Sequence, residues 1–230
     1  MKKASFAAFP LLFALSFPAT ATIISGTVTG GTAQTAGGTF VKLTVPLANP
    51  FGPPNSLGND NFQSPNLYGF DEDQNILLTA PLTVDVGASP IPDGTVVASH
   101  YIFFDPGPTL HVIGTVNFDS QVVGIITSTG PLAASDFLAT TGVNYLSTAA
   151  SGLEPGDSVT ISGPQQILFD TFASSPGDYV RVLTLFSPAP ASAPEPEALP
   201  LLGGGLLVAA SLLGRKGGRN FRKHQHKRSI

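Results

Sequence analysis

Two aspartates and an asparagine stand close together in the chain with a spacing that resembles a calcium loop. Asp71, Asp73 and Asn75 alternate with other residues, so hard oxygen ligands recur every two positions. An EF-hand next requires glycine and later a carboxylate, but Ile76 and Leu82 occupy those positions. The sequence therefore excludes an EF-hand. It leaves a solvated acidic turn or a non-standard Ca²⁺ site, the one candidate cofactor site, formed by Asp71, Glu72 and Asp73.

Two histidines precede the C-terminal tail, His100 and His111, with Asp105 between them. If the strands expected over 96–104 and 112–118 formed a hairpin, both histidines would approach one edge, as a metal site or a His–Asp acid–base pair requires. The sequence lacks the Gly-x-Ser-x-Gly, phosphate-loop and His-Glu-x-x-His motifs. We therefore predict no catalytic residue, no enzyme activity and a half-buried structural role for His100.

Arg181 is one of only two basic residues, with Lys42, between residues 22 and 193, where thirteen acidic residues give a net charge of about −11. A guanidinium on a strand within such a domain needs a carboxylate partner, and a bidentate pair suits it best. The candidates nearest in sequence are Asp157, Asp170 and Asp178. The same charge repels phosphate backbones, so we exclude nucleic acid as a partner and retain divalent cations and neutral glycans.

The N-terminal residues 1–21 have the composition of a Sec signal peptide. Lys2 and Lys3 precede an apolar segment over 4–18, and Ala19 and Ala21 are the small residues of a cleavage site. We therefore expect cleavage before Thr22. A short membrane anchor is the alternative, but the apolar segment is brief and contains two prolines.

The C-terminal residues 194–230 combine a short motif, an apolar segment and a basic tail. Pro194, Glu195 and Pro196 precede a transmembrane helix predicted over about 198–213, in which Ser211 is the only polar side chain. A soluble amphipathic helix, the alternative, would show polar residues every three or four positions. By the positive-inside rule, we expect the basic tail over 214–230 to lie in the cytoplasm and the body to lie on the other side of the membrane.

This order of features resembles the PEP-CTERM sorting signal of exported proteins from Gram-negative bacteria. The resemblance implies exosortase as a partner, anchoring to the inner membrane by the C-terminal helix with a periplasmic body, and then release to the cell surface or the extracellular space. It also implies an association with exopolysaccharide and biofilm. Segments between Leu67 and Thr184, including Asn66–Glu72 and Gly94–Tyr101, resemble a body domain of other PEP-CTERM proteins, from which no activity follows.

Short β-branched segments separated by turns fill the region between the two ends, and there is no cysteine to form disulfides. The pattern predicts an all-β fold, a single antiparallel β-sandwich of jelly-roll type over 22–186, followed by a linker over 187–193. A long loop is expected over 46–66, a turn at Thr129–Pro131 and a short helix over 135–139. Strands are predicted over 23–29, 41–45, 74–79, 82–86, 96–104, 112–118, 122–127, 158–162, 166–171 and 179–186.

Two functions follow from these observations. The first is a non-enzymatic surface or matrix protein, sorted by exosortase and associated with exopolysaccharide. The alternative is a glycan-active enzyme or a Ca²⁺-dependent glycan-binding module on a jelly-roll scaffold. Acidic residues converging with His100 in a cleft would favour the enzyme, whereas a flat surface with scattered acids would favour the binding or structural protein.

Overall fold

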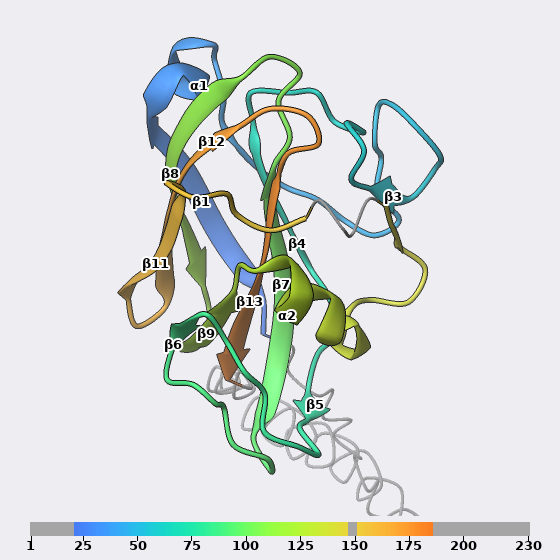
Figure 1. Ribbon diagram of the computed structural model, residues 1–230, viewed down its shortest axis with the longest axis vertical. Helices are drawn as coiled ribbons and strands as arrows, with labels where there is room; N and C mark the ends of the chain where they lie inside the picture. The colour runs from blue at the N-terminus through green and yellow to red at the C-terminus, as the bar shows by residue number, and fades with distance from the viewer. Residues whose placement is uncertain (1–20, 147–150, 186–230) are drawn as a thin grey trace, which may run out of the picture. The chain divides into compact units, whose positions relative to one another are not determined.

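The computed structural model describes residues 21–146 and 151–185 of the 230-residue chain (Figure 1). These residues are mainly strands joined by loops, with few and short helices, so the fold class is all-β. Ala19, the linker, Pro194–Pro196 and the predicted transmembrane helix lie outside the described residues, and Ala21 is the first residue within them. In the described ranges, no helix is both long enough and apolar enough to cross a membrane.

One layer is a four-stranded antiparallel sheet with the order β1–β8–β12–β11. Its strands are β1 (Ile23–Gly30), β8 (Leu110–Phe118), β12 (Gln166–Ala173) and β11 (Ser158–Gly163). Along β12, and along β8 from Val112 on, buried residues alternate with residues that reach solvent. This alternation is typical of a sheet with one face in a core and the other in water.

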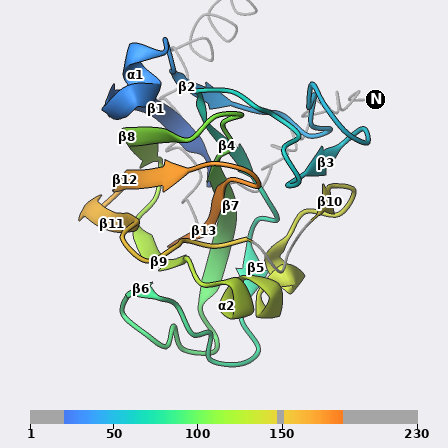
Figure 2. The ribbon, with the colours of Figure 1, turned by 45° about the horizontal axis from the view of Figure 1, so that its top comes forward.

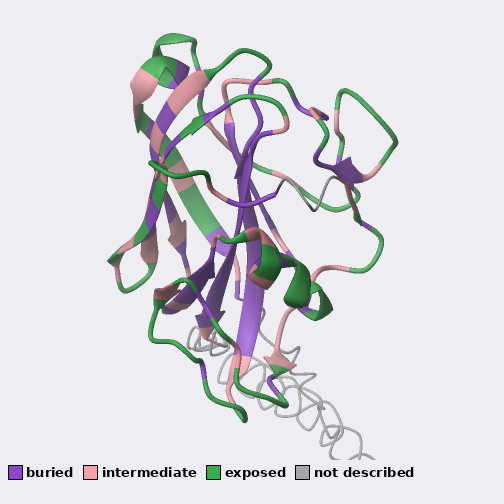
Figure 3. Ribbon diagram, in the orientation of Figure 1, coloured by how far each residue is buried: buried purple, intermediate pink, exposed green. Residues whose placement is uncertain are grey.

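The second layer is a larger sheet with the order β2–β4–β7–β13–β9–β6, in which β5 also pairs with β7. Its central strands, β7 and β13, are buried along almost their whole length because both faces of the sheet are covered (Figure 3). The strands are β2 (Phe40–Lys42), β4 (Leu67–Asp71), β5 (Ile76–Leu77), β6 (Val86–Gly87), β7 (Val96–Phe104), β9 (Val122–Ile126) and β13 (Asp178–Leu185).

Two hydrophobic cores lie on the two faces of this larger sheet. The first joins it to the four-stranded sheet, through residues such as Val116, Phe169 and Val182. The second lies under loops and helices, where Tyr101 and Phe103 of β7 are among the buried residues. Figures 1 and 2 show the four-stranded sheet on one side of β7 and β13, and α2 with the segment around β3 on the other.

Several predicted elements differ from the structure. The long loop predicted over 46–66 contains β3 (Ser56–Leu57), which pairs with β10 (Asn144–Tyr145), and it contributes buried residues to the second core. β4 was not predicted as a strand, and the strand predicted over 82–86 is formed only from Val86. The β2–β4 and β3–β10 pairs are parallel, so the sheets are not purely antiparallel as predicted.

The helices are α1 (Gly31–Thr35), α2 (Thr129–Ala134) and the 3₁₀ helix η1 (Asp136–Leu138). The turn predicted at Thr129–Pro131 is the start of α2, a position where proline is tolerated because the first N–H groups of a helix have no partner within it. Asp85 holds the chain just before this helix, since its Oδ2 accepts hydrogen bonds from Thr127 N at 2.7 Å and Ser128 N at 2.8 Å. The predicted helix over 135–139 corresponds to η1.

Candidate functional site

Asp71 lies at the end of β4, and its carboxylate is surrounded by donors. Its Oδ2 is 2.8 Å from Lys42 Nζ and accepts a hydrogen bond from Thr22 Oγ1 at 2.7 Å, while its Oδ1 is 2.8 Å from His100 Nδ1. Burial alone would raise the pKa of Asp71. The contacts with His100, Lys42 and Thr22 outweigh this effect and hold the pKa well below its usual range.

Glu72, the next residue, serves a different cluster. Its two carboxylate oxygens accept hydrogen bonds from Arg181 Nε at 2.8 Å and Nη2 at 3.0 Å, a bidentate pair in which both side chains are almost completely buried. Ser99 Oγ and Tyr145 Oη each donate a further bond of 2.6 Å to Glu72. Burial opposes the charge of Arg181, but the adjacent Glu72 carboxylate raises the pKa of the guanidinium overall. The partner of Arg181 is thus Glu72, and not Asp157, Asp170 or Asp178.

The Ca²⁺ site predicted from Asp71, Glu72 and Asp73 is therefore wrong. The two neighbouring carboxylates bind different partners on opposite faces of the sheet, because successive side chains along an extended segment point to opposite sides. Asp73 contributes its main chain, whose carbonyl accepts a hydrogen bond from Ser99 N at 3.0 Å. Within the described parts of the chain, no group of three or more His, Cys, Asp or Glu residues could hold a metal.

His100 is completely buried in the first core, where its ring packs against Phe118 with the centroids 4.9 Å apart. Both ring nitrogens have partners: Nδ1 contacts Asp71, and Nε2 lies 3.0 Å from Thr184 Oγ1. The half-buried role predicted for His100 is wrong, since the residue is fully enclosed. The hairpin that would join it to His111 is not formed either, because β7 and β8 belong to different sheets.

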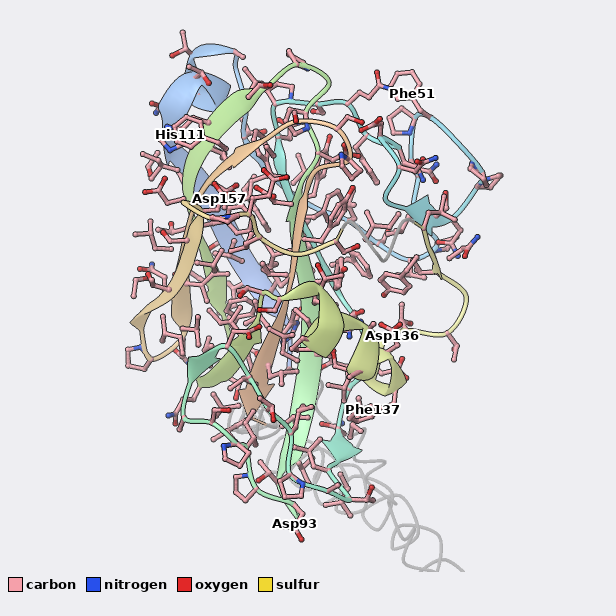
Figure 4. All side chains as sticks on the ribbon, viewed as in Figure 1. Phe51, Asp93, His111, Asp136, Phe137 and Asp157 are labelled. Atoms are coloured by element: carbon pink, nitrogen blue, oxygen red, sulfur yellow. The ribbon has the colours of Figure 1, made fainter. Side chains whose placement is uncertain are left out.

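His111 lies instead on the solvent face of the four-stranded sheet, near α1 (Figure 4). Its ring stacks on Phe172 with a centroid distance of 3.9 Å and an angle of 4° between the planes. Its Nε2 is 2.7 Å from Asp170 Oδ1. Phe172 is 57% exposed, so this stack presents an aromatic surface to solvent.

A row of hydrogen bonds crosses the same face and joins all four strands. Asn117 Nδ2 donates to Ser25 Oγ at 3.1 Å, and Gln166 Nε2 donates to Asn117 Oδ1 at 2.7 Å. Ser162 Oγ completes the row by donating to Gln166 Oε1 at 3.0 Å. Asn117 and Gln166 also line a surface hollow of about 460 Å³, together with Ile24 and Pro164.

The face between this row and the His111–Phe172 stack is largely uncharged. The register places Thr27, Thr115, Leu168 and Thr160 side by side across the four strands. Asp170 is the one carboxylate on the outward-facing positions of β8 and β12. Lys42 and Arg181, the only basic residues in the described ranges, both belong to the other sheet. We call this surface, from the Asn117–Gln166 row to the His111–Phe172 stack, the polar face.

The residues of the polar face could be found only in part from the sequence. The alternation in β8 and β12 identifies their outward positions, but not that β8 and β12 are neighbours. Tyr68, Tyr101 and Tyr179 do not offer a sugar-stacking surface, because all three are buried. Phe172 was missed, since an isolated phenylalanine in a strand is usually a core residue.

Comparison of the chain with family models, curated proteins and solved structures finds no match.

Proposed function

We propose that the body of this protein binds neutral polysaccharide through the polar face of its four-stranded sheet. The observation that carries the proposal is the row Ser25–Asn117–Gln166–Ser162, an array of hydroxyl and amide groups next to a surface hollow and on the same face as an exposed aromatic stack. Amides and hydroxyls both donate and accept hydrogen bonds, as sugar hydroxyls do. The ring of Phe172 supplies an apolar surface for the C–H face of a sugar ring.

The charge of the body favours a neutral polymer over an anionic one. The described residues are acidic in excess, and neither Lys42 nor Arg181 lies on the polar face to pair with a uronate, sulfate or phosphate group. An anionic chain would meet net repulsion. The glycan-active enzyme receives no support from His100, because a histidine enclosed in the core and bonded at both nitrogens cannot reach a substrate.

Affinity electrophoresis in gels that contain dextran, glucomannan or hydroxyethyl cellulose tests this function. We expect at least one neutral polymer to retard the protein, and Phe172→Ala to weaken the retardation at least about tenfold, the equivalent of about 1.4 kcal/mol. Phe137→Ala is the matched control, since Phe137 is also 57% exposed but lies on η1 (Figure 4). Equal effects of the two substitutions, or no retardation by any polymer, would contradict the proposal.

We further propose that the protein reaches this polymer by export and exosortase sorting. The support comes from the sequence: the two Lys of the predicted signal peptide, the Pro194–Pro196 motif, the apolar segment over 198–213 and the basic tail. The product is a cell-surface or matrix protein, anchored in the inner membrane before processing. Replacing Pro194, Glu195 and Pro196 by alanine should leave an uncleaved, membrane-retained form of higher mass in a host with exosortase. Normal maturation of the triple variant would contradict this.

The contacts of Thr22 are compatible with cleavage after Ala21. The main-chain nitrogen of Thr22 donates a hydrogen bond of 2.8 Å to Asp119 Oδ1. Cleavage would convert this nitrogen into an ammonium group facing a carboxylate, and charge-assisted hydrogen bonds are stronger than neutral ones. The new cation would also reduce the acidic excess of the body. N-terminal sequencing of the mature protein should find Thr22 as the first residue. A different first residue would contradict cleavage after Ala21.

We also propose that the body is a β-sandwich of jelly-roll type. The support is that the β7–β8 and β12–β13 connections both pass between the sheets, while β7 pairs with β13 and β8 pairs with β12. Paired strands that cross together in this way are typical of Greek-key and jelly-roll folds.

A further inference from the structure

Three segments meet around Asp105, the residue that follows β7. Phe62 N donates to Asp105 Oδ2 at 3.0 Å, and Ser64 N donates to the Asp105 carbonyl at 2.9 Å. Gly177, in the turn between β12 and β13, packs directly on Asp105, because a Cβ at this position would lie 3.0 Å from Asp105 Cα. The side chain of Asp105 is thereby fully enclosed.

Asp60 brings a second carboxylate to the same place. Its Oδ2 accepts a hydrogen bond from Ser175 Oγ, in the same turn as Gly177. Burial and, after it, the charge of Asp60 raise the pKa of Asp105 to about 6. One oxygen of each carboxylate, Oδ1 in both cases, is buried without a hydrogen-bond partner among the described residues. Buried carboxylate oxygens without donors are rare and costly.

The described part of the protein has no cation left to neutralise this pair. Its two basic residues are both engaged elsewhere, Lys42 with Asp71 and Arg181 with Glu72. The donors that do reach the pair, Phe62 N and Ser175 Oγ, bind the other oxygen of each carboxylate. Neither Oδ1 atom therefore has a hydrogen-bond donor or a cation as a partner among the described residues.

We propose that Asp60 and Asp105 bind a Ca²⁺ ion through their Oδ1 atoms. Carboxylate oxygens are hard ligands of the kind Ca²⁺ prefers, and Ca²⁺ completes its coordination with main-chain carbonyls and water. A site with two carboxylates belongs with the weak extracellular ones, which have Kd values of about 10⁻⁴–10⁻³ M. Mg²⁺ binds less well, because it demands octahedral geometry and loses water reluctantly. The ion would join the long loop to the β12–β13 turn, independently of any polysaccharide.

Calorimetry on the full-length chain in detergent micelles tests the site. The chain is first treated with EDTA and then scanned with EDTA, with about 10 mM CaCl₂ and with about 10 mM MgCl₂. At ten times Kd, mass action should raise the Tm by about 3–6 °C with Ca²⁺ and by less with Mg²⁺. Asp105→Asn should abolish the Ca²⁺ effect and raise the Tm in EDTA, because the repulsion from Asp60 is then removed.

Two further variants make the outcome decisive. Asp60→Asn should behave like Asp105→Asn, whereas Asp93→Asn, in the exposed loop before β7 (Figure 4), should keep the full Ca²⁺ effect. If a variant fails to fold, isothermal titration of the wild-type chain with CaCl₂ still reports whether one ion binds. No Ca²⁺ effect on the wild type, or the same effect in Asp105→Asn, would overturn the proposal. So would a Tm that responds to pH but not to Ca²⁺, since the carboxylates would then share a proton.

Discussion

Asp71 and Glu72 are neighbours in the chain, yet their ion pairs lie in very different environments. The Asp71–Lys42 pair reaches solvent, with side chains 25% and 36% exposed, whereas the Glu72–Arg181 pair is 0% and 1% exposed. The Asp71–Lys42 pair joins the end of β4 to the end of β2. The second joins the large sheet to the helical segment, since Arg181 Nη1 also donates to Leu132 O at 3.1 Å and to Ser135 Oγ at 2.5 Å.

The comparison shows that burial, and not the chemical type of the pair, decides its energetic consequence. Water screens an exposed pair and hydrates either partner when the other is removed. A buried pair has lost that hydration, so removal of one partner leaves a charge with nothing to replace it. In the buried cluster, Ser99 and Tyr145 satisfy the remaining acceptor sites of Glu72, which is what makes its burial possible.

The largest effect is expected from Arg181→Ala. The substitution leaves Glu72 buried without a cation and removes the bonds to Leu132 and Ser135, so the free energy of unfolding should fall by about 3–5 kcal/mol. Denaturant melts at neutral pH measure this loss. Arg181→Lys keeps the charge without the bidentate geometry and should fall between the wild type and alanine. A loss below about 1 kcal/mol for Arg181→Ala would remove the contrast between the two pairs.

An intermediate effect is expected at Asp178, a buried carboxylate that forms no ion pair with a basic side chain of the described residues. Burial, with the charges of Asp157 and Glu154, raises its pKa from 3.8 to about 7, and its Oδ2 has no partner among the described residues. The stability that the protonated form contributes is complete below pH 3.8 and is lost as the pH rises through about 7. Asp178→Asn should therefore be more stable than the wild type by about 1–3 kcal/mol at pH 8 and similar to it near pH 4.

Denaturant melts of both proteins from pH 4 to pH 8 measure this difference. Asp105 titrates in the same range, with a pKa of about 6, but its contribution is common to both proteins and cancels in the comparison. A constant difference between the two proteins over this range would show that Asp178 does not ionise on its own.

The smallest effect is expected from Lys42→Ala. Lys42 Nζ is 2.8 Å from Asp71 Oδ2 and also donates to the Ile23 carbonyl at 2.8 Å, but the side chain reaches solvent and Asp71 keeps its contact with His100. The free energy of unfolding should fall by less than about 1 kcal/mol, and by less still in 1 M salt. Melts at low and high salt measure both values. A salt-independent loss above about 2 kcal/mol would place this pair with the buried one.

The residue pattern was enough to predict the all-β character of the body and the approximate position of most long strands. The strand predicted over 96–104 coincides with β7, and those over 112–118 and 166–171 lie within β8 and β12. Local information was enough there because β-branched residues alternate between turns rich in Gly and Pro. It was insufficient for β4, whose apolar side chains pack on both faces of a central sheet and so show no simple alternation.

Which side chains meet depends on the order of the strands in the sheets, which the residue pattern does not reveal. The sequence predicted that Arg181 needs a carboxylate, since an isolated guanidinium is costly to bury, but it pointed to acids nearby in the chain and not to Glu72. Glu72 is 109 residues away from Arg181 in the chain. The two side chains meet because β4, which ends just before Glu72, and β13, which carries Arg181, are the two neighbours of β7 in the sheet. The polar face and the Asp60–Asp105 pair likewise join distant segments. Residue types set which partners are chemically suitable, and strand order set which of them are within reach.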